Sequence, residues 1–261
     1  MDEIRLDELD MEQRRKKIAE LIAQQGKVKV AGLSKLFGIS EVTIRNDLSG
    51  LESEGLLERT HGGAISTHRM YYNMSLKERM KTNEAEKKSI ALRTASLILD
   101  GDTVMINSGS TTIFVIRELK NHKNLTVVTN SLSVAEEAIP FKNIHIILIG
   151  GNMDAQYQFT YGDDTVHQLG RYKADKLILS ADGVSFEDGI STYHHLEAEV
   201  NRQMIARVNK TIVVADYTKI GMASFAYIDS IDSIDTLVTN KEANAEEIGQ
   251  MAEKGIEVKL V

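Results

Sequence analysis

The sequence of 261 residues contains no cysteine, no tryptophan and a single proline. Without cysteine the chain forms neither disulfides nor thiolate metal sites, which suits the reducing cytoplasm. One proline excludes proline-rich linkers. No apolar run approaches the roughly 20 residues that cross a bilayer, and the acidic start MDEIRLDELD lacks the apolar core of a secretory signal. We therefore expect a globular, cytoplasmic protein with no membrane partner.

The net charge of −7 is unevenly distributed along the chain. Residues 1–10 hold five acids and one base, whereas residues 11–69 hold ten bases and seven acids. The remaining residues are acidic overall. A mildly basic segment before an acidic body is compatible with a small DNA-binding module attached to a larger domain that does not bind DNA.

The first seventy residues predict a winged helix-turn-helix. EQRRKKIAELIAQQG has apolar residues at helical spacing, KVKV alternates like a short strand, and a second helical pattern ends at Gly38. A third helix begins after Ser40, whose hydroxyl is a good N-cap. LLERTHGGAI predicts two strands around a glycine turn. In this order of elements, the third helix is the one that enters the major groove of DNA.

The third helix and the hairpin supply candidate DNA-binding residues. Arg45 can donate two hydrogen bonds to guanine, Asn46 can pair with adenine, and the Thr43 methyl group can contact thymine. Lysines before this helix suit phosphate contacts, which position a protein without reading sequence. The alternative is an ordinary solvated helical bundle in which Arg45 is a surface charge. The candidate set is Lys29, Ser40, Val42, Thr43, Arg45, Asn46, Arg59, His61 and Gly62.

From residue 102 onward, strand-like runs alternate with helical patterns. The strand candidates are TVMIN, LTVVTN, NIHIILIG, KLILSAD, KTIVVAD, IDTLVTN and VKLV. Helical patterns at 111–120, 132–139, 196–208 and 243–253 fill most of the gaps. Near-continuous valine, isoleucine and leucine indicates strands covered on both faces. The alternation predicts a Rossmann-like, mainly parallel α/β sheet.

These patterns predict two domains in one α/β chain. Residues 1–68 form the winged helix-turn-helix domain, with residues 1–10 as an acidic tail. Residues 69–82 form a linker that runs into a helix at about 83–99. Residues 83–261 form the α/β domain.

Small polar residues and glycines follow five of the predicted strands. Ligands of doubly wound sheets bind beyond the carboxyl ends of the strands, so agreement among these ends predicts one pocket. Any single glycine is ordinary turn chemistry. The residues concerned are Asn107, Ser108, Gly109, Ser110, Thr111 and Thr112, then Asn130 and Ser131, then Gly150 and Gly151, then Asp182 and Gly183, and finally Lys219.

The stretch from Ser108 to Thr112 brings four hydroxyl groups to the start of a predicted helix. Unpaired N–H groups and the helix dipole bind phosphate there, and the hydroxyls add donors. Simple N-capping, the alternative, needs one serine or threonine. The sequence has neither G-x-x-x-x-G-K-[ST] nor G-x-G-x-x-G, which argues against a nucleoside triphosphate or a dinucleotide.

Three further residues suit recognition of a sugar phosphate. Asp182 and Glu197 can accept hydrogen bonds from sugar hydroxyls, and Lys219 can contact a phosphate or pair with a carboxylate. The alternatives are a turn residue for Asp182 and solvated surface positions for the other two. His194 and His195 lack the spacing of a metal motif, so no metal or other cofactor is expected.

The sequence from Arg14 to Ala64, including SEVTIRNDLSGLESEGLLERTHGGA, resembles the N-terminal signature of the DeoR family of bacterial transcriptional regulators. NSGSTT, VVTNSL, LIGG, ADGVSFEDGIST, EAEVNRQM and VVADYTKIG resemble the effector domain of that family. That domain is similar in fold to ribose-5-phosphate isomerase and glucosamine-6-phosphate deaminase, and it senses phosphorylated sugars. The resemblance implies a phosphate at Ser108 to Thr112, with Asn130, Gly150, Gly151, Asp182, Glu197 and Lys219 around the ligand.

Three positions depart from the family pattern. The family more often has a second arginine where this chain has Asn46, an aspartate where it has Asn107, and LGADG where it has LSADG. These differences are expected to affect base preference and the choice of sugar. TIRNDL, TYGDD and STYHHLEAEVNRQM look most like regulators of the amino-sugar or galactosamine subgroup.

We therefore expect a repressor of a carbohydrate operon that binds a double-stranded DNA operator as a homodimer or homotetramer. A phosphorylated sugar in the C-terminal domain is expected to relieve repression. One alternative is a sugar-phosphate isomerase or deaminase that uses Asp182, Glu197 and Lys219 for proton transfer, although an enzyme has no evident need for the first seventy residues. Another is a sugar-phosphate-binding protein whose N-terminal bundle contacts proteins.

Overall fold

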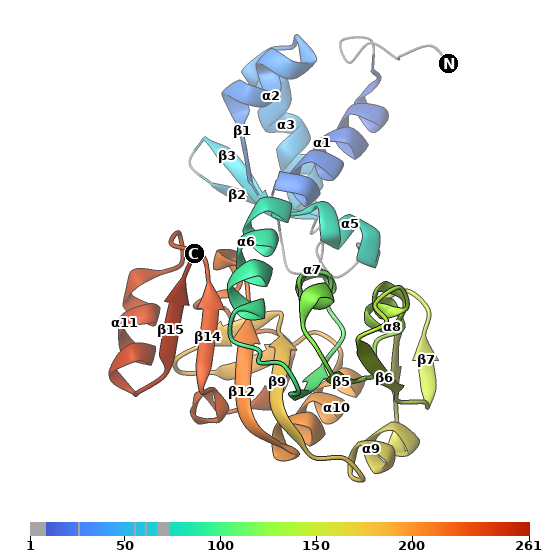
Figure 1. Cartoon of the computed structure of the whole chain (residues 1–261). Helices are drawn as coiled ribbons and strands as arrows, with labels where there is room; N and C mark the ends of the chain where they lie inside the picture. Colours follow the sequence, from blue (N-terminus) through green and yellow to red (C-terminus); the bar gives the residue numbers. More distant parts are fainter. Residues whose placement is uncertain (1–8, 26, 55, 61, 67–73) are drawn as a thin grey trace. The chain divides into compact units, whose positions relative to one another are not determined.

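The computed structural model describes residues 9–25, 27–54, 56–60, 62–66 and 74–261 of the chain (Figure 1). The chain divides into two compact units, Met1–Asn83 and Glu84–Val261. Among the residues described, none of the helices has the length and apolar character to cross a bilayer.

The N-terminal unit has the order of elements predicted for a winged helix-turn-helix. Its three-stranded antiparallel sheet has the order β1-β3-β2. Its elements are α1 (Met11–Gln25), β1 (Lys27–Lys29), α2 (Val30–Phe37), α3 (Glu41–Ser53), β2 (Leu57–Thr60), β3 (Gly63–Ser66) and α5 (Leu76–Lys81).

One apolar core joins the helices of this unit to its sheet. Ile18 of α1, Phe37 of α2, and Ile44 and Leu48 of α3 are all fully buried in it. The i, i+4 spacing on α3 puts its apolar side chains on one face, and that face packs inward. Gly38, at φ 65°, ends α2 in the left-handed conformation that glycine adopts readily. The opposite face of α3 is therefore left for solvent.

The C-terminal unit is built on a seven-stranded parallel sheet with the order β15-β14-β12-β9-β4-β5-β6. These strands are β4 (Thr103–Ile106), β5 (Leu125–Thr129), β6 (Ile144–Leu148), β9 (Ala174–Ser180), β12 (Val208–Val214), β14 (Thr236–Thr239) and β15 (Glu257–Leu260). All seven overlap the predicted strand runs, although β9, β12 and β15 begin one or two residues before them, so the parallel α/β fold is confirmed.

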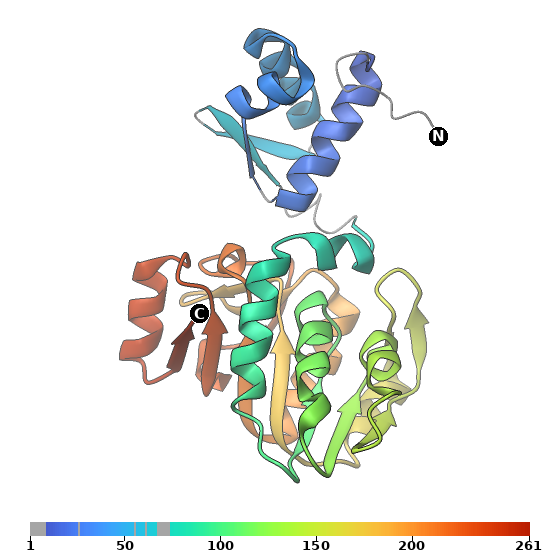
Figure 2. The same cartoon turned by 45° about the horizontal axis from the view of Figure 1, so that its top comes forward.

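The helices of the C-terminal unit are α6 (Glu84–Ala95), α7 (Ser110–Glu118), α8 (Leu132–Ala138), α9 (Asp163–Leu169), α10 (His195–Ala206) and α11 (Ala245–Glu253). Short 3-10 helices lie at η2 (Leu119–Asn121), η3 (Tyr217–Lys219) and η4 (Ile231–Ser233). In both views of the fold, α6 and α7 lie side by side on one face of the sheet (Figures 1 and 2).

Two small antiparallel sheets were not predicted. One has the order β10-β11-β13, from β10 (Gly183–Ser185), β11 (Gly189–Thr192) and β13 (Ala226–Asp229). The other pairs β7 (Asn152–Asp154) with β8 (Phe159–Tyr161). Both come directly after strands of the main sheet, so they extend the edge at which those strands end.

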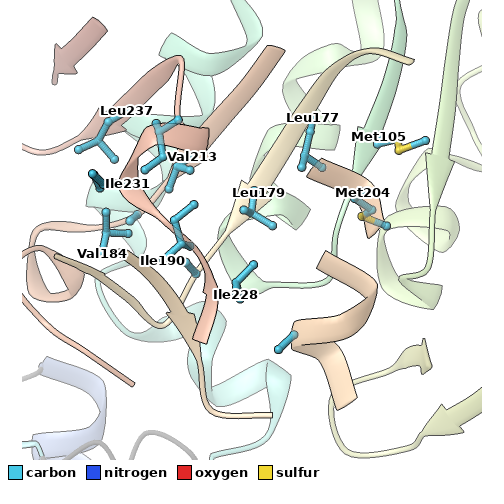
Figure 3. Packing of buried hydrophobic residues seen from close by; sticks show 14 of the residues in the cluster. Met105, Leu177, Leu179, Val184, Ile190, Met204, Val213, Ile228, Ile231 and Leu237 are labelled. Atoms are coloured by element: carbon cyan, nitrogen blue, oxygen red, sulfur yellow. The ribbon is translucent and has the colours of Figure 1, made fainter. Parts of the chain in front are cut away.

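A large apolar cluster joins the main sheet to α10 and to the β10-β11-β13 sheet (Figure 3). Leu177 and Leu179 of β9 belong to it, together with Met204 of α10, Ile190 of β11 and Ile228 of β13. All five are fully buried. This packing fixes the small sheet and the start of α10 beside the carboxyl ends of the main strands.

Candidate effector and DNA-binding sites

Helix α3 presents the predicted base-reading residues to solvent. The Ser40 hydroxyl accepts a hydrogen bond from the Thr43 N–H at 3.1 Å, which caps the helix as expected. Arg45 and Asn46 are exposed, and Val42 is 63% exposed. An exposed valine on an otherwise polar surface is available for apolar contact, for example with a thymine methyl group. The helix thus has a buried face and an open polar face.

Ionic contacts orient both faces of α3. On the open face, Arg45 pairs with Glu41 at 2.5 Å, one helical turn away. On the inner face, the buried Asp47 accepts from Arg14 at 2.7 Å and from Arg15 at 3.3 Å. Because α1 supplies both arginines, the inner contact fixes the angle between α1 and α3. The Glu41 contact is exposed, and such surface pairs contribute little to stability.

The predicted wing is attached to the end of α3. The Arg59 N–H donates to Glu52 at 2.9 Å, and the Arg59 guanidinium donates to the Ser49 hydroxyl at 2.6 Å. Gly62 is exposed at φ 95°, in the turn between β2 and β3. Lys29 is exposed in β1. His61 lies outside the described residues.

The five strand ends singled out in the sequence meet at one edge of the main sheet. Strands β12, β9, β4, β5 and β6 are consecutive and parallel, so their carboxyl ends point the same way. From β4 the chain builds outward through β5 and β6, then crosses back to β9 on the other side. The point where strand order reverses is where open α/β sheets bind ligands.

Helix α7 begins at this reversal point without a side-chain cap. Its N-cap is Gly109, which has no side chain to accept from the first N–H groups. The Thr112 hydroxyl donates to the carbonyl groups of Asn107 at 3.0 Å and Gly109 at 2.9 Å. Ser110 and Thr111 are buried in the same first turn. N-capping, the alternative considered for these hydroxyls, is therefore not their role.

A hydrogen-bonded chain connects the α7 loop to the small sheet and α10. The Ser108 hydroxyl donates to Glu197 Oε1 at 2.6 Å, and the Thr192 hydroxyl lies 3.3 Å from Glu197 Oε2 and 3.1 Å from Asp182 Oδ2. The Tyr193 N–H also donates to Asp182 Oδ2, at 3.1 Å. Glu197 is only 7% exposed, so the solvated alternative for this residue is wrong.

Thr192 was missed by the sequence reasoning although it sits between the two predicted carboxylates. Its sequence context, GIST, lies outside the strand candidates and suggested no role for it. The contact depends on β11 pairing with β10, and that pairing brings Thr192 back beside Asp182. Nothing in the local pattern predicted this pairing.

Lys219 lies in η3, directly after β12. A parallel bridge pairs Ile220 with Val184, which places Lys219 alongside Gly183. Lys219 is 7% exposed, so a solvated position is wrong for this residue as well. The structure thus brings the fourth and fifth strand ends together.

Asp216 begins η3 and is fully buried. Burial alone raises the pKa of its carboxyl, but the ammonium groups of Lys219 and Lys87 and hydrogen bonds from Thr218 outweigh burial and hold the pKa below its usual range. Asp216 is therefore a carboxylate that two buried lysines stabilise in its charged form.

The β5 end contributes a buried acceptor. The Asn130 Nδ2 group donates to the Thr160 carbonyl at 3.0 Å, whereas its Oδ1 atom is buried without a hydrogen-bond partner among the described residues. An unpaired buried acceptor is costly, which makes this oxygen a candidate to accept from a ligand hydroxyl. Ser131 instead caps α8 by accepting from the Val134 N–H.

The β6 end is packed against α9. The Gly150 N–H donates to Gln168 at 3.2 Å, and its carbonyl accepts from Thr165 at 2.8 Å. Gly151 has φ 144°, and a Cβ atom there would lie 2.0 Å from the Thr165 hydroxyl. Glycine at 151 is thus required by close packing.

Asn107 is also fixed within the protein. It is fully buried and bonds to Ser180 through both amide atoms and to Asn201 at 3.2 Å. Asn107 therefore holds the ends of β4 and β9 together, and its amide is engaged within the protein. Among the described residues there is no group of three or more histidine or acidic side chains arranged to hold a metal ion.

Comparisons with known proteins agree on both units. Residues 14–70 match the DeoR-like helix-turn-helix domain, and residues 82–241 match the DeoR C terminal sensor domain. A protein of Escherichia coli O157:H7 whose name assigns it to the aga operon as a transcriptional repressor is 34% identical over 251 residues, covering 95% of this chain and 93% of that protein. The transcriptional repressor GlcR of Bacillus subtilis is 32% identical, covering 95% of each chain. The glycerol-3-phosphate regulon repressor of Escherichia coli is also 32% identical, covering 87% of this chain and 90% of that protein.

Among solved structures, ribose 5-phosphate isomerase A of Methanocaldococcus jannaschii aligns with 53% of this chain and 55% of its own, with a TM-score of 0.40 and 19% identity. This likeness is partial and does not bear on function.

Proposed function

The chain belongs to the DeoR family of DNA-binding transcriptional regulators, and from that premise we propose that it represses an operon of carbohydrate metabolism until a phosphorylated sugar binds to its C-terminal unit. The relatives are named as regulators, so the isomerase or deaminase alternative is set aside. Because the aga repressor is among them, the proposed effector belongs to the amino-sugar phosphates. As a DNA-binding regulator, the protein acts in the cytoplasm.

The observation that carries the effector proposal is the first turn of α7. The turn begins at Gly109, has buried hydroxyls at Ser110 and Thr111, and lies where strand order reverses. Uncapped N–H groups with the helix dipole and nearby hydroxyls make a binding site for a phosphate monoester. We place the phosphate there.

The remainder of the sugar is proposed to lie along the same edge. Asp182 and Glu197 accept from its hydroxyls, Asn130 Oδ1 accepts another, and Lys219 balances negative charge. Ser108 lies in the loop before α7, and its hydrogen bond to Glu197 connects the proposed phosphate position with the proposed acceptors of the sugar hydroxyls. The other proposed effector residues support the position of these groups along the edge of the sheet. They are Asn107, Thr112, Ser131, Gly150, Gly151 and Gly183.

DNA recognition is assigned to the open face of α3 and to the wing. Arg45, Asn46, Val42 and Thr43 are proposed to meet base edges. Lys29, Ser40, Arg59, His61 and Gly62 are proposed to contact the backbone. We keep the boundaries expected from the sequence as part of the proposal: residues 1–68 bind DNA, residues 69–82 connect, and residues 83–261 sense the effector.

Two copies or four are proposed to act together. A single winged helix buries too little surface for tight specific binding, so paired half-sites and a homodimer or homotetramer are needed. The effector releases DNA by favouring a conformation in which the paired modules no longer match the half-site spacing. This requires different effector affinities in the two conformations.

The first test uses the full chain to select DNA duplexes from a random library. The melting temperature of the protein is then measured with each of four compounds: galactosamine 6-phosphate, glucosamine 6-phosphate, glycerol 3-phosphate and inorganic phosphate. A specific duplex should be enriched. One sugar phosphate should raise the melting temperature, while the same sugar without phosphate should not. The active sugar phosphate should weaken duplex binding. If no duplex is enriched, or if no compound changes the melting temperature, the proposal is wrong.

A pair of variants at Ser110 tests the phosphate position. Ser110→Asp puts a negative charge at the start of α7 and should abolish the thermal response while duplex binding persists. Ser110→Ala keeps the backbone N–H groups and should retain most of the response. An unchanged response in Ser110→Asp would remove this turn from the effector site.

A further inference from the structure

Helix α6 is the element by which the chain enters the C-terminal unit. It begins at Glu84, the first residue of that unit, directly after Asn83, whose φ is 50°. Because α6 precedes the parallel strand β4, its first turns lie at the carboxyl edge of the sheet. This is the edge that carries the proposed effector residues. Through residue 83, the backbone connects these turns to the DNA-binding unit.

One buried amide joins α6 to the loop that carries Lys219. Asn240, which is 2% exposed, follows β14. Its Nδ2 group donates to the Glu86 carbonyl and to the Ser89 hydroxyl, each at 3.3 Å, and its Oδ1 atom accepts from the Tyr217 N–H at 3.2 Å. Asn240 therefore contacts the first two turns of α6 on one side and η3 on the other.

A buried charge cluster makes a second connection between the same two elements. Lys87 on α6 has no exposed surface, and Asp216 at the start of η3 is 1% exposed. The charges of both Lys87 and Lys219 act on the Asp216 carboxylate. Lysine is almost never fully buried unless it is paired. One carboxylate thus interacts with a lysine of the proposed effector site and with a lysine of α6.

The other half of the proposed effector site also contacts α6. Helix α6 packs along α7, whose first turn is the proposed phosphate position (Figures 1 and 2). It also packs on β12 and β14, the strands that lead to Asp216 and Asn240. The helix that leads into the sensor unit therefore packs on α7, which carries the proposed phosphate position, and on the strands that lead to Asp216 and Asn240.

We propose that Lys87 and Asn240 are positioning residues that transmit effector binding from Lys219 to the first turns of α6. An anion that engages Lys219 draws its ammonium group away from Asp216, and Asp216 then attracts Lys87 more strongly. The first turn of α6 shifts relative to η3, while Asn240 keeps the two elements in contact. Neither Lys87 nor Asn240 touches the effector. This inference rests on the proposed function.

The test compares Lys87→Met and Asn240→Ala with the parent, using the selected duplex and whichever sugar phosphate of the four-compound panel raises the melting temperature most. Both variants should bind that compound within about threefold of the parent and should bind the duplex equally well without it. The factor by which the compound weakens duplex binding should be at least fivefold smaller in the variants. Allosteric coupling typically amounts to 5- to 150-fold, so such a loss is measurable.

Two further variants separate transmission from general damage. Lys88→Met removes an exposed lysine of the same helix, which pairs with Glu84 at 2.7 Å, and should leave the coupling unchanged. Lys87→Arg keeps the positive charge and should retain most of the coupling between compound binding and duplex binding. Hydrogen exchange of residues 84–95 should respond to the compound in the parent and in Lys88→Met, but not in Lys87→Met.

The outcomes separate this inference from the function on which it rests. Parental coupling in both Lys87→Met and Asn240→Ala would overturn the inference and leave the proposed function intact. Loss of compound binding in these variants would also overturn it, because both residues would then act on the pocket itself. If no panel compound binds the parent, the proposed function fails first.

Discussion

Asn107 and Ser180 form a closed pair of hydrogen bonds across strands β4 and β9. The Asn107 Nδ2 group donates to the Ser180 carbonyl at 2.9 Å, and its Oδ1 atom accepts from the Ser180 N–H at 2.8 Å. The pair spans the point where the strand order reverses, so it sets the separation of the two loops between which the effector is proposed to bind. The amide is suited to this role because it both donates and accepts.

Asn107→Asp should destabilise the C-terminal unit by about 1–3 kcal/mol at pH 7. Asn201 can turn its amide to donate to the new carboxylate, but the Ser180 carbonyl cannot, so two acceptors face each other. The buried aspartate would have a pKa above its unfolded value of about 3.9. Its protonated form donates to Ser180, so the deficit should shrink as the pH falls toward 4. Calorimetry of the full-length parent and variant at pH 7 and pH 4 measures the difference in their free energies of unfolding. An equal difference at both pH values would contradict this account.

Gly109→Ala should weaken the same reversal point by overpacking. A Cβ atom at 109 would lie 2.6 Å from the Ser180 hydroxyl oxygen and 2.7 Å from its Cβ atom. Such a clash costs about 1–3 kcal/mol of stability. In a Ser180→Gly background the alanine should cost much less, because the clashing atoms are gone. A double-mutant cycle by thermal unfolding tests this, and additive effects would refute the clash.

Arg45→Ala should reduce affinity for the selected duplex by about 1–3 kcal/mol and relax its sequence preference. The reason is loss of a bidentate contact to guanine, the base that arginine reads most often. Titration of selected and scrambled duplexes measures both effects. Arg171→Ala, which removes an exposed arginine of the C-terminal unit, is the control and should change neither. Parental discrimination by Arg45→Ala would exclude this residue as a base reader.

Asp216 should make the stability of the C-terminal unit depend on pH in the acid range. Its folded pKa is depressed, since Lys219 and Lys87 outweigh the effect of burial. The contribution of the Asp216 carboxylate to the stability of the folded unit is therefore complete above the unfolded pKa of about 3.9. This contribution is lost as the pH falls through the lower pKa of the folded state. The stability difference between the parent and Asp216→Asn, measured by calorimetry, should be largest near neutral pH and should narrow below pH 4. If the stability difference widens on acidification, the pKa of Asp216 is raised in the folded state and the direction assigned here is wrong.

The sequence predicted the elements whose apolar periodicity is strong. Ile18, Ile44 and Leu48 are buried as their spacing indicated. The parallel strands follow the predicted apolar runs, although helix ends differ by a few residues: α6 stops at Ala95, whereas the pattern extended to about residue 99. The predicted 69–82 linker contains α5, whose Ser75 forms a capping box with Glu78.

What the sequence did not predict depends on contacts between distant segments. Lys87 lies on a helix with little amphipathic contrast, and a lysine there indicates a solvated face. It is nevertheless fully buried, and its charge acts on a carboxylate 129 positions later in the chain. Asn240 is an unremarkable residue at a strand end until β14 is placed beside α6. The convergence of strand ends was predictable because parallel strands have one carboxyl edge, whereas the small sheets that bring Thr192 to Asp182 were not.

The order of elements along the chain also determines the order in which the two units are completed during synthesis. The α3 surface and its wing are complete by residue 66, whereas the main sheet takes its last two strands from Thr236–Thr239 and Glu257–Leu260. Because domains generally fold in the order in which they leave the ribosome, the operator-reading head matures while its sensor is still being translated. A newly made chain thus folds its DNA-binding unit before the sheet that carries the proposed effector site is complete.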